Sequence, residues 1–348
     1  MLRKLFISCV SLGLLASFYG CAKQESQPVP ETGGARKVQV GLVFDIGGRG
    51  DKSFNDSAYA GLERAAKEFG LEMGKDIEYI EPSESADREN ALRKLVDKKK
   101  DIIFAIGFIF SDDVNRVAAE FKDVKFACVD YVPPADEATI LPNVVGLKFK
   151  EEEGSFLVGA ITGLVTKTNK VGFVGGMQSA LIKKFEVGYK AGVKQVNPKC
   201  TVIANYAGVK AEAFKDPAKG KELALSMYDK KADIIYHASG STGLGVFEAA
   251  RDKNKLAIGV DADQYKEAPG HVLTSMIKRV DESIFQEIKA VKEGTFKNGI
   301  RTFDLASNGV DYVYDENNKN LISEDVHTQV EEIRKKIIQG EIKVPSTP

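Results

Sequence analysis

Short apolar stretches alternate with longer amphipathic segments from residue 38 onward. The apolar stretches are rich in β-branched residues and read VQVGLVF, DIEYI, DIIFAIG, VKFACVD and NVVGLKF. The segments between them have helical spacing, as in SAYAGLERAAKEFG, where one face holds Ala58, Leu62, Ala65, Ala66 and Phe69. Alternation of strand and helix predicts parallel strands with helices on both faces of a sheet.

The same pattern begins again after the predicted helix EEEGSFLVGAITGLVTK. The next strands read KVGFVGG, CTVIANYA, ADIIYHAS and LAIGVD, again with helical segments between them. We therefore predict two doubly wound α/β lobes joined by a hinge, with a ligand cleft between them. The first lobe would take residues 37–150 and about 279–300, and the second about 151–278 and 301–348.

Polar residues stand at the carboxyl ends of several predicted strands. In open α/β sheets, ligands bind in the crevice at these ends. The residues at or just past the strand ends are Asp45, Asp130, Gly240, Asp261 and Lys278. A carboxylate paired with an ammonium suits vicinal hydroxyls. The alternative for each aspartate is an ordinary cap for the following helix, and for Lys278 a surface position at a helix start.

Two phenylalanines occupy loops or helix starts that belong to opposite predicted lobes. Phe54 lies in DKSFND, in the loop that leaves the strand ending at Asp45, and Phe185 lies in LIKKFEVGY. We predict that the helix after Phe54 starts near residue 55 or 56. Phe54 alone is explained equally well as a hydrophobic staple, and Phe185 alone is explained better as an inward-facing helical residue. Together they suggest an aromatic sandwich for a flat heterocycle.

The first residues resemble an export signal. Arg3 and Lys4 precede the apolar stretch LFISCVSLGLLASF, and a small residue stands directly before Cys21. We predict a lipoprotein signal peptide at 1–20, acylation of Cys21, and a flexible tether at 21–36. An ordinary secretory signal is the alternative. Either one places the protein outside the cytoplasm, and the first anchors it to a membrane.

Composition narrows the functional classes. The net charge is −1 and there is no long basic run, which argues against a nucleic-acid partner. Three scattered histidines do not have the spacing of a zinc site, and nothing else indicates a metal or cofactor. Cys128 and Cys200 lie in or beside apolar stretches, a pattern that favours two buried free thiols over a disulfide.

From residue 38 to 345, the chain resembles the basic membrane protein family of lipoproteins, the PnrA-like purine nucleoside receptors. The resemblance is carried in order by DKSFND, EEEGSFLVGAITGL, KVGFVGGM, FEVGYKAGVKQVNP, ADIIYHASGSTGLGVFEAARD, AIGVDADQY and VLTSMIKR. It implies a periplasmic-binding-protein-like type I fold and capture of purine nucleosides for an ABC permease. It also implies a base stacked between Phe54 and Phe185.

The resemblance further assigns a role to each polar candidate. Asn55 and Asp130 would read the polar edge of the base. Asp45 and Gly240 would reach the sugar or the adjacent edge, and Asp261 and Lys278 would hold the ribose.

Two other functions fit some of the same residues. Clustered carboxylates could make an extracytoplasmic nucleoside hydrolase, although the sequence offers no metal cluster or well-placed histidine for that chemistry. The same fold could also bind a sugar or a small signalling molecule, because aromatic platforms suit those ligands too.

Overall fold

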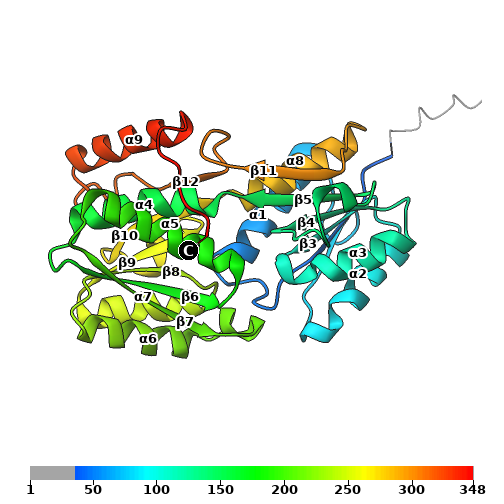
Figure 1. Ribbon diagram of the computed structural model, residues 1–348. Coiled ribbons are helices and arrows are strands. Elements are labelled where there is room, and N and C mark those ends of the chain that lie inside the picture. The colour runs from blue at the N-terminus through cyan, green and yellow to red at the C-terminus, as the bar shows by residue number, and fades with distance from the viewer. Residues whose placement is uncertain (1–35, 348) are drawn as a thin grey trace, which may run out of the picture. The chain divides into compact units, whose positions relative to one another are not determined.

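The computed structural model describes residues 36–347 (Figure 1). Residues from Lys37 onward form one compact unit. The predicted signal peptide, the acylation site Cys21 and all but the last residue of the predicted tether lie outside the described residues. Within that range, no helix combines the length and the apolar character needed to cross a bilayer.

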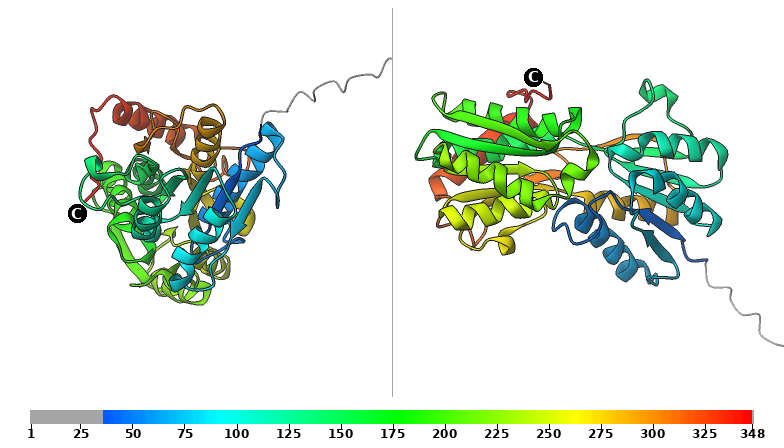
Figure 2. Two further views of the ribbon diagram at one scale, coloured as in Figure 1. Left: turned by 90° about the vertical axis from the view of Figure 1, so that its right-hand side faces the viewer. Right: turned by 90° about the horizontal axis from the view of Figure 1, so that it is seen from below.

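Two six-stranded sheets organise the part of the chain from residue 37 to 347. The first has the order β11-β5-β4-β3-β1-β2 and the second β12-β10-β9-β8-β6-β7. Neighbouring strands are parallel except for β10 and β12, which pair antiparallel. The predicted fold class, two α/β lobes built on parallel strands, is therefore confirmed (Figures 1 and 2).

The first lobe contains the elements β1 Val40–Val43, α1 Phe54–Phe69, β2 Ile77–Ile80, α2 Arg88–Asp97, β3 Ile102–Ile106, α3 Ser111–Glu120, β4 Lys125–Val129, β5 Val144–Phe149, α8 Val280–Lys292 and β11 Gly299–Phe303. The second contains α4 Glu151–Val165, β6 Lys170–Met177, α5 Ala180–Val196, β7 Thr201–Gly208, α6 Pro217–Asp229, β8 Ile234–Ala238, α7 Thr242–Lys253, β9 Leu256–Asp261, β10 Val272–Lys278, β12 Val310–Tyr312 and α9 Glu324–Ile338. Helix α8 packs on α1, and α9 packs on α4. The predicted boundary near residue 300 falls inside β11.

The chain passes between the lobes where β5 leads into α4, where β10 leads into α8, and between β11 and β12. Backbone hydrogen bonds tie these segments together. Lys150 N donates to Phe303 O at 2.9 Å, and Arg279 N donates to Gly309 O at 2.9 Å. The three crossing segments thus form a hinge and are joined to one another by backbone hydrogen bonds.

Helix α1 shows how the sequence pattern produces the observed packing. Its buried face includes Ala58, Leu62 and Ala65, and it ends at Gly70, whose φ of 64° is the left-handed cap that glycine favours. The helix begins at Phe54 itself and not near residue 55 or 56 as predicted. The reason is Asp51, whose carboxylate accepts hydrogen bonds from the first free N–H groups and so starts the helix earlier.

The two cysteines within the described residues, Cys128 and Cys200, are both free thiols. Cys128 is buried in β4, as predicted, whereas Cys200 is only partly buried, directly before β7. The expectation of two free thiols holds, but burial is complete for only one of them.

Helices α4 and α5 pack closely because glycines remove side chains from their interface. A Cβ added at Gly192 would lie 2.0 Å from Phe156 O, a backbone atom that has no room to move. We expect Gly192→Ala to destabilise the fold by about 1–3 kcal/mol through overpacking, although alanine ordinarily stabilises a helix relative to glycine. Urea unfolding measures the difference.

Gly154→Ala is the matched control for that substitution. A Cβ at Gly154, in α4, would lie 3.1 Å from the flexible Met276 side chain and 3.2 Å from Val310 Cβ, both well beyond the 2.0 Å at Gly192. We therefore expect Gly154→Ala to cost much less than Gly192→Ala. Equal stabilities for the two variants would contradict the proposed backbone clash.

Candidate functional site

A pocket between the two lobes is lined by all eight ligand residues expected from the sequence. Its empty space, including the part open to solvent, is about 570 Å³. The expected residues that line it are Asp45, Phe54, Asn55, Asp130, Phe185, Gly240, Asp261 and Lys278. They come from the ends of β1, β4, β8, β9 and β10 and from α1 and α5. The residues at the predicted strand ends thus line one pocket, and their role as ligand contacts stays a prediction.

The two candidate aromatic rings face the same small space. The Lys278 Nζ atom lies 5.0 Å from the centroid of the Phe54 ring and 5.6 Å from that of the Phe185 ring. Phe54 belongs to the first lobe and Phe185 to the second, and both line the pocket. Both also pack against the core, so the packing interpretation is true as well. A flat ligand between them would contact both lobes.

The loop before α1 is held by carboxylates, and this fixes the position of Phe54. Asp51 accepts hydrogen bonds from Ser53 N at 2.9 Å, Asn55 N at 2.9 Å and Asp56 N at 3.1 Å. Asp56 accepts from Gly50 N at 2.8 Å and Lys52 N at 3.1 Å. These hydrogen bonds close the glycine-rich turn, and the Phe54 ring that follows it lines the pocket.

Asn55 uses most of its side-chain amide within its own lobe. Its Oδ1 accepts from Asp45 N at 3.0 Å, and its Nδ2 donates to Asp51 at 3.1 Å. One Nδ2 hydrogen remains for a ligand. Asn55 thus joins Asp45 to Asp51 and can offer one donor to the pocket.

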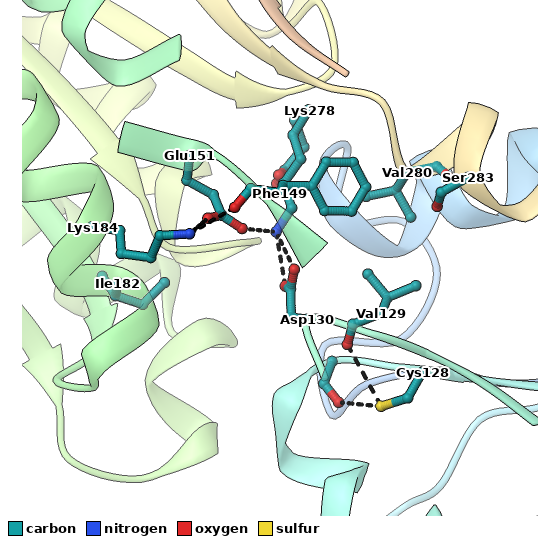
Figure 3. Close-up of polar contacts among 12 residues, drawn as sticks. Cys128, Val129, Asp130, Phe149, Glu151, Ile182, Lys184, Lys278, Val280 and Ser283 are labelled. Atoms are coloured by element: carbon teal, nitrogen blue, oxygen red, sulfur yellow. Dashed lines mark hydrogen bonds and ion pairs between the residues drawn. The ribbon is translucent and has the colours of Figure 1, made fainter. Parts of the chain in front are cut away.

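Lys278 is the buried cation at the centre of the site. Its Nζ donates to the two carboxylate oxygens of Asp130 at 2.7 and 2.8 Å and lies 3.1 Å from Glu151 Oε1 (Figure 3). Burial alone would lower the pKa of Lys278, but the carboxylates of Asp130, Glu151 and Asp261 raise it. The lysine is therefore charged at neutral pH. Its closest carboxylate across the lobes is Asp130; the assignment of Asp261 and Lys278 to a ribose stays a prediction.

The pocket contains more carboxylates than ammonium groups. Burial raises the pKa of Asp45 to about 7 and that of Asp261 to about 7, although the Ile46 N–H lowers the first and the Lys278 charge lowers the second. Burial also raises the pKa of Asp130 to about 6 against the opposing charge of Lys278. Such a site offers acceptors to hydroxyl and N–H donors and repels a phosphate.

Backbone geometry also marks this site. Asp130 has a φ of 62° and Asp261 a φ of 68°, both in the left-handed region. Aspartate tolerates this region better than most residues, but the conformation still costs of order 1–3 kcal/mol and is concentrated at functional sites. At these two strand ends it places both carboxylates in the pocket.

Polar contacts between the lobes hold the pocket closed. Ser53 Oγ donates to the Asp261 carboxylate, and Gln264 Nε2 donates to Lys52 O at 2.9 Å. Gln264 Oε1 in turn accepts from Val260 N at 2.8 Å. The loop that carries Phe54 is therefore joined to the second lobe beside the acid that the resemblance assigns to the ribose.

Several lining residues were not predicted. Phe108 follows Gly107 directly after β3, and the same strand-end rule would have identified it. Asp51 could have been recognised as a helix-starting acid three residues before Phe54. Phe214 belongs to a short 3₁₀ helix, Ala211–Phe214, for which the pattern of apolar residues gives no signal.

We expect the ligand-free protein to lose stability as pH rises from about 4 to about 7. Asp45 and Asp261 keep their protons in the folded state up to about pH 7, whereas in the unfolded chain they lose them near 3.8. Their contribution to the free energy of unfolding is therefore fully present below pH 4 and is lost as pH passes through 7. Urea unfolding between pH 4.5 and 8 measures this slope.

Asp45→Asn tests the origin of that slope. The amide is a neutral isostere, so the variant should be more stable than the wild type at pH 8, by on the order of a few kcal/mol, and should show a shallower slope. Asp229→Asn, at an exposed position, serves as the control. An unchanged slope in Asp45→Asn would contradict burial as the cause.

Comparison with known proteins finds a matching family and related sequences. Residues 37–348 match the family model described as ABC transporter substrate-binding protein PnrA-like. A Listeria innocua protein named CD4+ T-cell-stimulating antigen is 39% identical over 332 residues, covering 90% of each chain. A Lactococcus lactis protein named ABC transporter nucleoside-binding protein BmpA is 34% identical, covering 99% of each chain.

A solved structure also has the same fold. It is a solute-binding protein of an ABC transporter system from Aeropyrum pernix K1, with a TM-score of 0.80 and 29% identity. The match covers 88% of this chain and 94% of that chain. The sequence resemblance and the expected type of fold are both confirmed by these matches.

Proposed function

Because this chain belongs to the PnrA-like family of ABC transporter substrate-binding proteins, we propose that it captures purine nucleosides outside the cytoplasm and delivers them to a membrane permease. The observation that carries the proposal is the placement of Phe54 and Phe185, from opposite lobes, around one pocket. The nucleoside-binding relative in Lactococcus lactis supports the ligand class.

In this proposal the base stacks between the two rings. Stacking on an aromatic side chain contributes about 1–3 kcal/mol per base. Asn55 and Asp130 bond to the polar edge of the base. One Asn55 N–H is available as a donor, and Asp130 accepts when ionised and can donate when protonated.

The carboxylates and Lys278 hold the sugar. Asp261 and Asp45 accept hydrogen bonds from the ribose hydroxyls, and Lys278 donates a hydrogen bond to a ribose hydroxyl oxygen. At the pocket wall, the positive φ of 56° at Gly240 allows a tight turn. A nucleotide would bring a phosphate against several buried acids and a single lysine, so we expect nucleosides to be preferred.

Ligand binding is coupled to closure of the lobes. A ligand that contacts both lobes binds the closed state more tightly than the open one, and this difference in affinity shifts the population towards the closed state. The predicted signal peptide at 1–20 would direct export, and acylation of Cys21 would then keep the protein beside its permease.

Calorimetry with adenosine, guanosine and inosine tests the proposed function. Binding of at least one of them well below millimolar concentration is expected, and its absence for all three would refute the proposal. Incubation with inosine tests the hydrolase alternative in the same sample. We expect inosine to remain intact, and release of hypoxanthine would favour the enzyme.

A further inference from the structure

Glu151 is a fully buried acid that the proposed ligand contacts leave unused. It is the first residue of α4, directly after the segment where β5 crosses between the lobes, and its exposed fraction is 0%. Its Oε1 lies 3.1 Å from Lys278 Nζ but makes no hydrogen bond of normal geometry. Its contact with Lys278 is therefore an ion pair.

Lys184 holds the other oxygen of the same carboxylate. Its Nζ contacts Glu151 Oε2, donates to Phe149 O at 2.6 Å and lies 3.1 Å from Glu152 Oε2. Figure 3 shows the resulting series of alternating charges, from Lys184 through Glu151 and Lys278 to Asp130. Lys184 belongs to α5 and Phe149 to β5, so this series also joins the two lobes.

Glu151 differs from Asp130 and Asp261 in the direction in which its pKa is shifted. Burial alone would raise the pKa of Glu151, but Lys278 and Lys184 hold it below its ordinary value. Asp130 and Asp261 instead have raised pKa values of about 6 and about 7. At neutral pH, Glu151 is therefore fully ionised and Asp130 largely so, whereas Asp261 is about half protonated.

We propose that Glu151 is the positioning residue for Lys278. It holds the lysine ammonium at the pocket when the Asp130 carboxylate forms hydrogen bonds with the ligand. This inference rests on the proposed nucleoside function. Lysine has three N–H donors, and Asp130 occupies two of them at short distance. When a ligand competes for Asp130, Glu151 keeps the ammonium in place, and a freed N–H can turn to a ribose hydroxyl.

The alternative is that Glu151 serves only as a structural partner for Lys184. Glu152 provides the control, because it forms an ion pair with Lys184 at 3.1 Å but no contact joins it to Lys278 among the described residues. A purely structural role would make Glu151→Gln and Glu152→Gln similar in ligand binding. A positioning role would act only through Lys278.

A double-mutant cycle separates the two roles. Inosine and 2′-deoxyinosine are titrated by calorimetry at pH 7.5 into the wild type, Glu151→Gln, Glu152→Gln, Lys278→Met and Glu151→Gln/Lys278→Met. We expect Glu151→Gln to weaken inosine binding by about tenfold and to reduce the preference for inosine over 2′-deoxyinosine. Glu152→Gln should stay within about twofold of the wild type.

The decisive value is the effect of Glu151→Gln when Lys278 is absent. The double variant should bind inosine no more weakly than Lys278→Met alone. The same loss in both backgrounds would overturn the positioning role while leaving the nucleoside function intact. A wild type that binds no nucleoside would refute both.

A measurement on the unmodified protein covers the case in which Glu151→Gln does not fold. In a crystal structure of the wild type with inosine, Lys278 Nζ should remain within about 4 Å of Glu151, the limit for an ion pair. A lysine that has turned away from Glu151 in the complex would overturn the inference.

Discussion

Phe54→Ala is expected to weaken inosine binding by about 5- to 150-fold, the equivalent of about 1–3 kcal/mol of stacking energy. The ring lies at the start of α1, where Asp51 fixes the backbone through three N–H groups, so removing the side chain should leave the loop intact. Calorimetry measures the affinity, and thermal unfolding checks that the fold is retained.

Two further variants make this loss specific to stacking. Phe54→Leu keeps an apolar side chain but removes the π face, so it should bind inosine more weakly than the wild type. Phe69→Ala removes a ring that stacks on Phe285 at 5.3 Å, away from the pocket, and should lower stability but not affinity. A Phe54→Ala variant that has lost purine binding but still binds a free sugar would show that the pocket recognises sugars, and this would count against a nucleoside receptor.

Lys278→Met is expected to lower the free energy of unfolding by about 3–5 kcal/mol at pH 8, because it leaves buried carboxylates without their counter-ion. The ammonium is 2% exposed and faces Asp130 and Glu151, with Asp261 close enough to affect its pKa. Without Lys278, the pKa values of Asp130 and Asp261 should rise further.

The loss of unfolding free energy in Lys278→Met should therefore depend on pH. At pH 5, Asp130 and Asp261 are largely protonated in the folded state, so losing the lysine should cost less than at pH 8. Lys253→Met is the control, because its ion pair with Asp229 is exposed and should contribute at most about 1 kcal/mol. An equal deficit at both pH values would contradict unpaired aspartates as the cause.

The sequence predicted the lobes and the pocket because both depend on local signals. Strands such as β3 and β8 are buried along their whole length, as parallel strands are expected to be. The residues that end such strands must lie at one edge of the sheet. Asp45, Asp130, Gly240, Asp261 and Lys278 could therefore be placed together without knowledge of the side-chain contacts.

Pairing within the pocket could not be predicted in the same way. Asp130 and Lys278 are 148 residues apart, and their contact depends on how the crossing segments bring the lobes together. Neither strand pattern nor helix spacing carries that information. Glu151 was not predicted for a related reason. A glutamate at a helix start is ordinarily explained by its favourable interaction with the helix dipole. Its burial between two lysines is visible only in the folded chain.

A crystal structure of the protein with inosine tests the central claim most directly. The purine ring should lie between the rings of Phe54 and Phe185, with the ribose hydroxyls within hydrogen-bonding distance of Asp261 and Lys278. A nucleoside bound elsewhere, or one in the pocket with its base outside the two rings, would contradict it.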